Sequence, residues 1–477
     1  MAGSGLPISH SSAETITSNA GSMGYPARAD RICSLLPPDA MASRYGPAAR
    51  STKPITHGNK VAGCVAVWSW KSAAFRSMMR AWVAWSQVPS RLVSNAAAQV
   101  RSGDWVDYGF GMGQPDEVDL ALAARCQSLE GVRIRSAFSL RPRAVVEADP
   151  EGRHFQWLNW HFSGLDRRLH DRGLAHYIPM NFGEAPDFYR RFLDPMDMAV
   201  IKVCPRDDAG FYNFSGACTY HGAILERARI VVVEVDPKLP YIPGPKSGIH
   251  ESDVDFVVET EGQGAAELKN PVANEVEARI ARLVAAEIGD GACLQIGIGG
   301  LPNAVCAAIR EAGLRDLGIH TEMMVDGLAD LCEAGLVTGS RKTTHPGRIV
   351  FTFAGGTQRL YGFLHRNPQV LSLPVDETNL PHLIQANDHV VSVNSTTQVD
   401  LQGQASSESS GHRHLTGTGG QLQFVRGAYA SRGGKSFLCV TSTRQRRDGS
   451  VESRIVTELT PGSVVTTPRT DVMYVAT

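Results

Sequence analysis

The sequence predicts an α/β protein made of two repeated α/β domains, the second of them richer in strands. Short β-type runs alternate with helical patterns from residue 103 onward. Each half also carries a glycine-rich turn between a strand and a helix opened by proline, which indicates an internal repeat. A chain of 477 residues is long enough for two cores, because single domains seldom grow beyond about 250 residues.

The first half opens with a strand at 105–108, a helix at 116–125 and a strand at 132–138. Two later runs, at 198–203 and 230–235, contain mostly apolar residues, and the second is nearly continuous in Val and Ile. Such runs are typical of strands that are covered on both faces. We therefore expect a parallel or mixed sheet.

The second half repeats this order and then continues with more strands. Its opening elements are a helix at 276–286, a strand at 294–298, a helix at 302–312 and a strand at 318–320. Apolar runs of the strand type follow at 349–353, 389–393, 437–440 and 472–475. The second domain is therefore expected to extend its sheet well beyond the repeated unit.

The two halves parallel each other around the glycine-rich turn. The matching residues are Gly109, Gly111, Gly113 and Pro115 in the first half, and Gly297, Gly299, Gly300 and Pro302 in the second. Twenty residues after the proline stand Arg135 in the first half and Glu322 in the second. The two halves are therefore predicted to differ in chemistry at that position.

We expect three parts: a leader at 1–75, an N-terminal α/β domain at 76–262 and a C-terminal α/β domain at 263–477. The leader is rich in Ala, Ser, Gly and Pro and poor in acids, which suits a transit peptide. A disordered leader or a wrongly assigned start explains it equally well. Nine scattered cysteines without a C-x-x-C pair indicate a reducing compartment. The predicted location is intracellular, either mitochondrial or cytoplasmic.

The charge balance excludes several classes of partner. With 47 basic and 48 acidic side chains the net charge is −1; the first hundred residues carry ten basic and three acidic groups, or +7, which leaves −8 for the remainder. Such a body lacks the clustered basic face that nucleic acid requires. The apolar run at 61–70 is shorter than the about 20 residues that a membrane span needs. We expect neither a nucleic-acid nor a membrane partner.

No metal site is expected. The pairs His154 with His161 and His412 with His414 are the candidates, but neither has a nearby cysteine or a zincin spacing. Solvated or packed histidines are the favoured interpretation.

A candidate anion or oxyanion site lies at the turn between the strand 294–298 and the following helix. Its backbone N–H groups and the helix dipole would face one spot. A dinucleotide motif is disfavoured because position 302 is proline, and a tight turn without a ligand is the alternative. The residues of this turn are Gly297, Ile298, Gly299, Gly300 and Leu301.

A second glycine-rich region contains Lys435. Its Gly434-Lys435-Ser436 triplet resembles the end of a phosphate loop, but Tyr429 occupies the place of the first glycine of that motif. Gly419 and Gly420 would still let the backbone approach a bulky substrate while Lys435 meets its phosphate.

Glu322 is the candidate nucleophile. It follows a short strand and precedes a helix that Asp326 can cap and Gly335 can end, so it should lie at the carboxyl edge of a sheet, where ligands bind. A carboxylate there is expected to be ionised at neutral pH and able to attack a thioester. From the residues alone, however, a surface salt bridge is the favoured interpretation.

Several segments together resemble the acetyl-CoA hydrolase/transferase family, especially its 4-hydroxybutyrate and butyrate:acetate CoA-transferase branch. The resemblance covers about residues 80–477. The segments are 103–104 with the turn that follows, 208–214, 231–236, 295–305, 318–327, 352–361, 399–408 and 417–436. It implies two domains of the CoA-transferase (NagB/RpiA-like) type.

The resemblance also implies roles for individual residues. The family's glutamyl-CoA thioester falls on Glu322, and its CoA-binding turn falls on the segment from Gly297 to Leu301. Its later Gly-Gly-Gln segment falls on Gly419, Gly420 and Gln421. Lys435 is carried over less directly.

The implied activity is ping-pong transfer of coenzyme A from an acyl-CoA to a short-chain carboxylate such as acetate, butyrate or 4-hydroxybutyrate. No cofactor would be bound permanently, because CoA is a substrate. Hydrolysis of acetyl-CoA, or CoA binding by an inactive homologue, are the alternatives. A homo-oligomer is possible from the sequence. Tyr177, Asn213 and Tyr361 can each be assigned to substrate binding or to the core.

One departure from the family concerns the end of the chain. Family members continue past the strand at 472–475 into a helical segment, so the C-terminal domain is expected to be truncated.

Overall fold

The computed structural model describes residues 91–269, 271–446 and 448–477. The predicted leader at 1–75 lies outside these residues. Among the described helices, none combines the length and the apolar character needed to cross a membrane.

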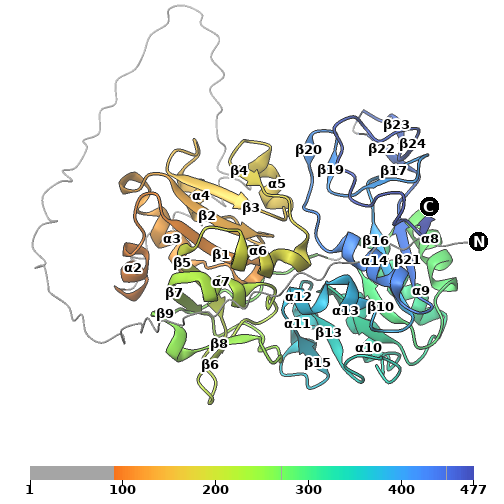
Figure 1. Ribbon diagram of the computed structural model, residues 1–477, viewed down its shortest axis with the longest axis horizontal. Helices are drawn as coiled ribbons and strands as arrows, with labels where there is room; N and C mark the ends of the chain where they lie inside the picture. The colour runs from red at the N-terminus through yellow and green to blue at the C-terminus, as the bar shows by residue number, and fades with distance from the viewer. Residues whose placement is uncertain (1–90, 270, 447) are drawn as a thin grey trace, which may run out of the picture. The chain divides into compact units, whose positions relative to one another are not determined.

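The first half forms a seven-stranded sheet in the order β4-β3-β2-β1-β5-β7-β9, with every neighbouring pair parallel (Figure 1). In that order the strands are Ala175–Tyr177, Phe155–Asn159, Val132–Ala137, Trp105–Phe110, Met196–Val203, Ala228–Val235 and Phe256–Glu259. Its α-helices are α2 (Arg91–Ala98), α3 (Glu117–Ala123), α4 (Ala144–Ala148), α5 (Gly164–His170), α6 (Ala185–Arg191) and α7 (His221–Arg227). The strands β6 (Phe211–Asn213) and β8 (Gly248–His250) form a separate two-stranded antiparallel sheet.

The second half forms another parallel seven-stranded sheet, in the order β15-β13-β11-β10-β16-β21-β25. In that order the strands are Val370–Ser372, Ile349–Phe351, Gly318–His320, Cys293–Ile296, Val390–Ser395, Lys435–Cys439 and Tyr474–Ala476. Its α-helices are α8 (Glu275–Ala286), α9 (Gly300–Glu311), α10 (Asp326–Glu333), α11 (Gln358–Leu364), α12 (Val375–Thr378), α13 (Pro381–Ile384) and α14 (Gln421–Ala430).

Four small sheets add to the strand content of the second half, as expected. They are β12 (Met323–Met324) with β14 (Phe353–Ala354), β17 (Gln398–Asp400) with β18 (Ala405–Ser406) and β24 (Ile455–Val456), β19 (Ser409–Ser410) with β20 (Arg413–His414), and β22 (Thr443–Gln445) with β23 (Val451–Ser453).

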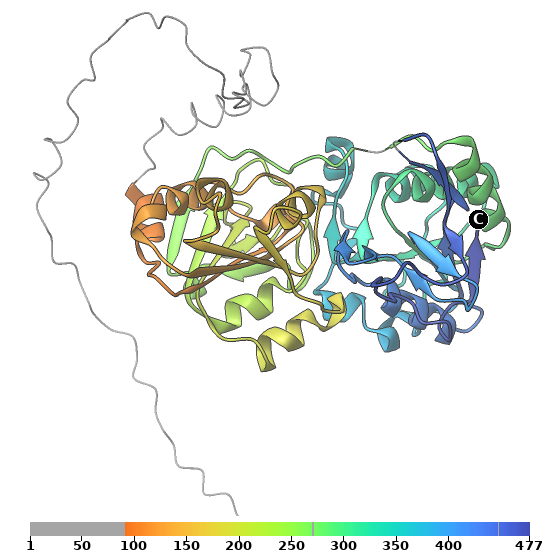
Figure 2. The same ribbon diagram turned by 90° about the horizontal axis from the view of Figure 1, so that it is seen from above.

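The predicted α/β class and the internal repeat are confirmed. Both sheets follow one scheme when β1 is matched with β10, and helices cover the two faces of each sheet (Figure 2). The central strands β5 and β7 are buried over most of their length, which explains their apolar sequences. The predicted boundary after residue 262 falls between β9 and α8 and stays a prediction.

The match of Arg135 with Glu322 is wrong by two residues. Trp105 and Cys293 open β1 and β10, and they pair with Arg133 and Gly318 respectively. The paired residues of these strands are 28 positions apart in the first half (105 to 133) and 25 positions apart in the second (293 to 318). Residues at the same distance from the proline therefore do not occupy the same place in the two sheets. The register instead matches Glu322 with Ala137. The halves still differ at this position.

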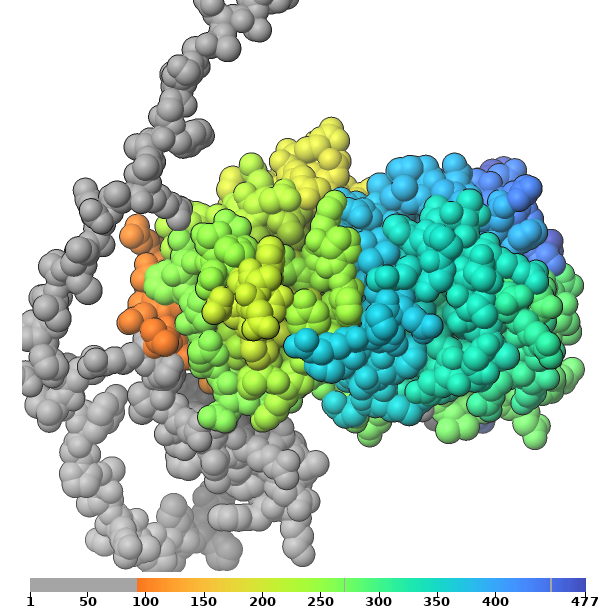
Figure 3. Space-filling model, turned by 90° about the horizontal axis from the view of Figure 1, so that it is seen from below, coloured from red at the N-terminus to blue at the C-terminus, as the bar shows by residue number. Residues whose placement is uncertain are grey.

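Hydrogen bonds join the two halves. The backbone N–H of Phe182 donates to the carbonyl of Gly419 at 3.1 Å, and that of Gly183 donates to Oε1 of Gln423 at 2.8 Å. Figure 3 shows the surfaces of the two halves in contact. The segment around Gly419 is therefore fixed by residues of both halves.

Candidate active site

Glu322 lies between β11 and β12, at the carboxyl edge of the second sheet. Its carbonyl oxygen accepts hydrogen bonds from the backbone N–H groups of Thr352 and Phe353, at 3.1 and 3.2 Å. The chain that connects β13 to β14 therefore fixes the backbone of Glu322. This position is the sheet edge predicted from the sequence.

Two donors hold the carboxylate of Glu322. The Asn379 amide nitrogen Nδ2 donates to Oε2 at 2.5 Å, and the backbone N–H of Gly420 donates to the same carboxylate. A Cβ atom at position 420 would lie only 2.2 Å from Oε2 of Glu322 and 2.3 Å from Nδ2 of Asn379. Glycine is therefore required there by the close approach of the backbone.

Asn379 follows α12, a helix of four residues, and a short chain of hydrogen bonds sets its orientation. The Thr378 hydroxyl donates to Oδ1 of Asn379 at 3.0 Å, which leaves Nδ2 directed at Glu322. Nε2 of His320 lies 2.8 Å from the carbonyl oxygen of Thr378, and its Nδ1 lies 3.4 Å from Nδ2 of Asn387. Since a carbonyl only accepts, His320 carries its proton on Nε2 and ties β11 to α12.

His320 is an uncharged residue that positions the segment carrying Asn379. Burial lowers the pKa of His320 to about 4, so the ring is uncharged at neutral pH. Its contacts are with protein groups, which identifies it as a support for the Asn379 amide.

Burial changes the expected charge of Glu322. Removal from water raises the pKa of Glu322 to about 7, although the hydrogen bonds from Asn379 and Gly420 oppose the rise. Full ionisation at neutral pH, which the sequence led us to expect, is therefore opposed by burial. The ionised form is poorly hydrated, which increases its reactivity toward a carbonyl carbon.

The turn from Gly297 to Leu301 lies at the same sheet edge as Glu322, because it follows β10, the parallel neighbour of β11. Gly299 precedes α9 with φ of 128°, a conformation that favours glycine. Ile298 is exposed and Leu301 is buried against the core. The turn thus opens a helix of twelve residues toward the edge at which Glu322 lies.

Of the two glycines predicted near the substrate, Gly420 contacts Glu322 directly and Gly419 lies beside it. Lys435 lies elsewhere. It opens β21, at the amino edge of the sheet, and its Nζ donates to the carbonyl and carboxylate of Glu287, at 2.9 and 2.7 Å. The structure therefore does not bring Lys435 together with Glu322.

The first half fills the corresponding helix end with its own carboxylate. Glu234, near the end of β7, accepts the backbone N–H groups of residues 116–118 at the start of α3, at 2.7, 3.0 and 3.0 Å. The strand registers match Glu234 with Cys439 of β21. Burial raises the pKa of the Cys439 thiol to about 12, so the side chain at this position is neutral.

The three polar residues left open by the sequence are bound by protein groups. The Tyr177 hydroxyl donates to Oε2 of Glu408 at 2.9 Å and accepts from the backbone of Thr418. Asn213 bonds the backbone carbonyl of Ile242, and the Tyr361 hydroxyl donates to a backbone carbonyl at 2.8 Å. Asn213 and Tyr361 therefore support the core, whereas Tyr177 supports the segment that carries Gly419.

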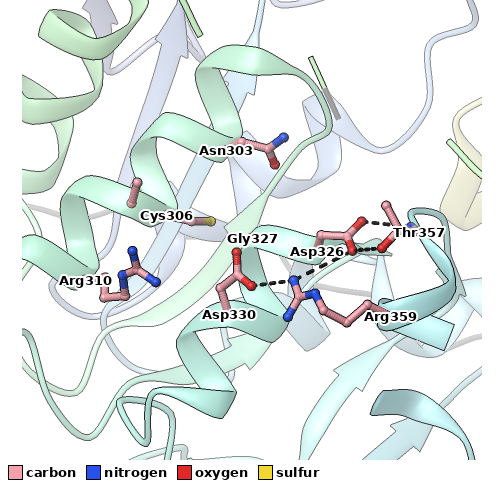
Figure 4. Close-up of a pocket in the computed structure, with 9 residues that line it drawn as sticks. Asn303, Cys306, Arg310, Asp326, Gly327, Asp330, Thr357 and Arg359 are labelled. Carbon is pink, nitrogen blue, oxygen red and sulfur yellow. Dashed lines mark hydrogen bonds and ion pairs between the residues drawn. The ribbon is translucent and has the colours of Figure 1, made fainter. Parts of the chain in front are cut away.

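A separate pocket of about 270 Å3 lies between α9, α10 and α11 (Figure 4). Asp326 lines this pocket and accepts hydrogen bonds from the backbone N–H of Thr357 at 3.0 Å and from its hydroxyl at 2.5 Å. Arg359, on the same pocket, forms ion pairs with Asp330 and Glu333. Asp326 is thus not the predicted cap of α10, whose cap position is Val325. Gly335 does follow the helix end, with φ of 74°.

One cluster of described residues has the spacing of a metal site. Cys126, Asp149 and His154 present ligand atoms within 4.8 Å of one another. Asp149 already accepts the backbone N–H groups of residues 153–155, at 2.6 to 3.0 Å. These bonds stabilise a turn, and we assign no metal to it.

Comparisons with known proteins match both halves of the chain. Residues 87–266 match the model of the acetyl-CoA hydrolase/transferase N-terminal domain, and residues 356–477 match that of the C-terminal domain. The chain is 42% identical to butyryl-CoA:acetate CoA-transferase of Anaerostipes caccae, over 81% of this chain and 87% of that protein. It is 37% identical to 4-hydroxybutyrate coenzyme A transferase of Clostridium kluyveri, over 80% and 87%.

Among solved structures, RipA from Yersinia pestis superposes with a TM-score of 0.73 and 34% identity, over 80% of this chain and 87% of that one. The fold, the order of the two domains and the sequence identity over most of the chain agree. The chain belongs to the acetyl-CoA hydrolase/transferase family.

Proposed function

We propose that this protein transfers coenzyme A from an acyl-CoA to a short-chain carboxylate, with Glu322 as the covalent carrier. The observation that carries the proposal is the Glu322 carboxylate held between the Asn379 amide and the Gly420 N–H at the edge of the sheet. A desolvated carboxylate beside two fixed donors suits nucleophilic attack on a thioester.

The first half-reaction has two attacks. Ionised Glu322 attacks the acyl carbonyl carbon and the C–S bond breaks. CoA thiolate departs, and an acyl-glutamyl anhydride is formed. The thiolate then attacks the glutamyl carbonyl carbon and the anhydride C–O bond breaks. The free carboxylate departs, and a glutamyl-CoA thioester is formed. An acceptor carboxylate reverses both steps and regenerates Glu322.

Each attack places negative charge on a carbonyl oxygen. Once Glu322 has become an anhydride or a thioester, Nδ2 of Asn379 and the N–H of Gly420 are available to that oxygen. Preorganised donors of this kind contribute about 3 kcal/mol each to the stabilisation of such transition states.

The segment from Gly297 to Leu301 would hold an anionic part of CoA at the start of α9. The contrast between the halves supports this role. In the first half Glu234 satisfies the end of α3, whereas Cys439, its counterpart, brings no charge to α9. The Glu277 carboxylate of α8 lies near this helix start, with Oε2 3.3 Å from a Cβ built on Gly300, so an anion of the substrate would bind beside it.

Transfer is favoured over hydrolysis, since relatives matched over about four fifths of the chain carry transferase names. The glutamyl thioester must also be shielded from water. Thioester loss that proceeds at the same rate without an added carboxylate would contradict transfer.

Intact-mass spectrometry after incubation with acetyl-CoA or butyryl-CoA tests the carrier. We expect a CoA-sized adduct on the wild-type chain, located by peptide mapping on Glu322 and absent from Glu322→Gln. Asp119→Asn is the control, because Asp119 is a buried carboxylate of the first half that accepts the backbone N–H of Ala144 and should leave the adduct in place. An adduct that persists in Glu322→Gln, or that maps to a cysteine, refutes the assignment.

A further inference from the structure

The peptide group between Gly419 and Gly420 lies between the first half of the chain and Glu322. Its carbonyl, on Gly419, accepts the backbone N–H of Phe182 at 3.1 Å. Its N–H, on Gly420, donates to the Glu322 carboxylate. Because a trans peptide group is planar and its C=O and N–H point in opposite directions, the bond from Phe182 fixes the direction of the N–H that faces Glu322. The first half of the chain therefore helps to orient a hydrogen-bond donor of the site.

The segment 415–418, which leads to this peptide group, is held by Glu408. Glu408 lies between β18 and β19 and is 3% exposed. Its carbonyl oxygen accepts the backbone N–H groups of Leu415 and Thr416, at 2.8 and 3.3 Å. Its carboxylate oxygen Oε2 accepts the hydroxyl of Thr418 at 2.9 Å. One residue thus bonds both ends of the segment.

Tyr177, the last residue of β4, connects the same carboxylate to the first half. Its hydroxyl donates to Oε2 of Glu408 at 2.9 Å and accepts the backbone N–H of Thr418 at 3.1 Å. The hydroxyl of Thr466 donates to the other carboxylate oxygen, Oε1, at 3.2 Å. Three hydroxyl groups from distant parts of the chain therefore share one buried acceptor, and each would lose a hydrogen bond without it.

His161, in the loop after β3, holds the segment from another side. The Thr416 hydroxyl donates to the carbonyl of Phe162 at 3.2 Å, so its oxygen accepts from Nε2 of His161, which lies 2.8 Å away. Burial lowers the pKa of His161 to about 4, so the ring is neutral and carries its proton on Nε2. A Cβ atom on Gly417 would lie 2.2 Å from the carbonyl oxygen of Trp160. The segment therefore packs directly against the first half.

We propose that Glu408 is a positioning residue of the transfer reaction: together with Tyr177 it holds the segment that places the Gly420 N–H at Glu322. The inference rests on the proposed CoA transfer through Glu322. Glu408 bonds the segment and acts through the Gly420 donor, so it takes no part in the covalent steps. Without Glu408 the N–H would no longer be fixed where negative charge develops on the glutamyl oxygen.

Kinetics of the full chain over a range of pH test this role. Loss of a fixed donor of this kind costs about 100- to 1000-fold in kcat, and a displaced donor keeps part of its effect. We therefore expect Glu408→Gln to lower kcat at least about tenfold. Because the Gly420 N–H lowers the pKa of Glu322, the rise of activity with pH should also move upward, which a loss of stability alone would not produce.

Two smaller changes decide the matter if Glu408→Gln does not fold. Tyr177→Phe removes the hydroxyl that bonds the carboxylate and the segment, and Thr418→Val removes the hydroxyl of the segment itself. Both should lower kcat and move the pH profile in the same direction as Glu408→Gln, by a smaller amount. Tyr189→Phe is the matched control, because it removes a buried hydroxyl that donates to the Asp107 carboxylate at 2.5 Å in the first half. It should leave kcat and the pH profile unchanged.

Thermal melting shows which variants are folded. Wild-type kcat in folded Tyr177→Phe and Thr418→Val would overturn the inference, as would an equal loss in Tyr189→Phe. A lower kcat with an unmoved pH profile would also overturn it, since the Gly420 donor would then be in place. Each of these results leaves the CoA adduct on Glu322 of the wild type intact, so the proposed function would survive. Absence of that adduct with every acyl-CoA would instead refute the proposed function.

Discussion

Replacing Glu322 by glutamine is expected to abolish transfer and, at the same time, to stabilise the fold at alkaline pH. The carboxyl group has a pKa near 4.5 when exposed, and burial raises it to about 7 in the folded protein. Folding therefore favours its protonated form. Glutamine has the same shape, can accept from Asn379 and Gly420 through its amide oxygen, and never carries the charge.

The sign and size of the effect follow from the linkage between protonation and folding. Between about pH 4.5 and 7 the folded state binds more protons than the unfolded state, so the wild type loses stability as the pH rises through this window. A shift of about 2.5 units corresponds to about 3 kcal/mol at 1.36 kcal/mol per unit. Glu322→Gln should thus match the wild type near pH 4.5 and exceed it by up to about 3 kcal/mol at pH 8.

Thermal or denaturant unfolding at pH 4.5, 6 and 8 measures this difference. Glu311→Gln, a substitution of an exposed glutamate on α9, is the matched control. If Glu322→Gln is less stable than the wild type at pH 8, or if its advantage does not shrink in acid, the carboxylate is not destabilised by burial as argued.

Other substitutions around the carboxylate have distinct expected outcomes. Asn379→Ala should lower kcat/KM about 100-fold, and since its hydrogen bond lowers the pKa of Glu322, the rise of activity with pH should move upward from about 7; an unmoved profile would contradict this contact. His320→Gln, whose amide can replace Nε2 as donor to Thr378, should keep more activity than His320→Asn; the reverse order would show that Nε2 does not hold α12. Gly420→Ala should fold but lose the CoA adduct, because its Cβ would displace the carboxylate; normal labelling by mass spectrometry would refute the close approach.

Much of the fold could be predicted because it follows from local patterns. Continuous apolar runs predicted buried parallel strands, and the repeated turn predicted two copies of one unit. Glu322 could be placed at a sheet edge for the same reason. The match with Arg135 failed because the segment between the paired strands is three residues longer in the first half, which spacing alone does not reveal.

The rest of the site depends on contacts between distant segments. Asn379 stands 57 positions after Glu322, directly after a helix of four residues, and no motif in its vicinity points to the carboxylate. The raised pKa of Glu322 likewise arises from burial, to which the folded chain as a whole contributes. Lys435 looked suitable from its glycine neighbours, but a β-strand places its two ends at opposite edges of the sheet, and Lys435 opens β21.

The carboxylate of Glu234 at the start of α3 bears on how many substrates one chain can carry. A doubled unit could in principle offer two equivalent binding sites. Because the first copy is closed by its own side chain and has Ala137 where the second has Glu322, loading should saturate at one CoA per polypeptide. A titration with acyl-CoA that ends at a single CoA-sized mass increment would agree with this expectation. In that case the second copy of the unit carries the substrate and the first copy only packs against it.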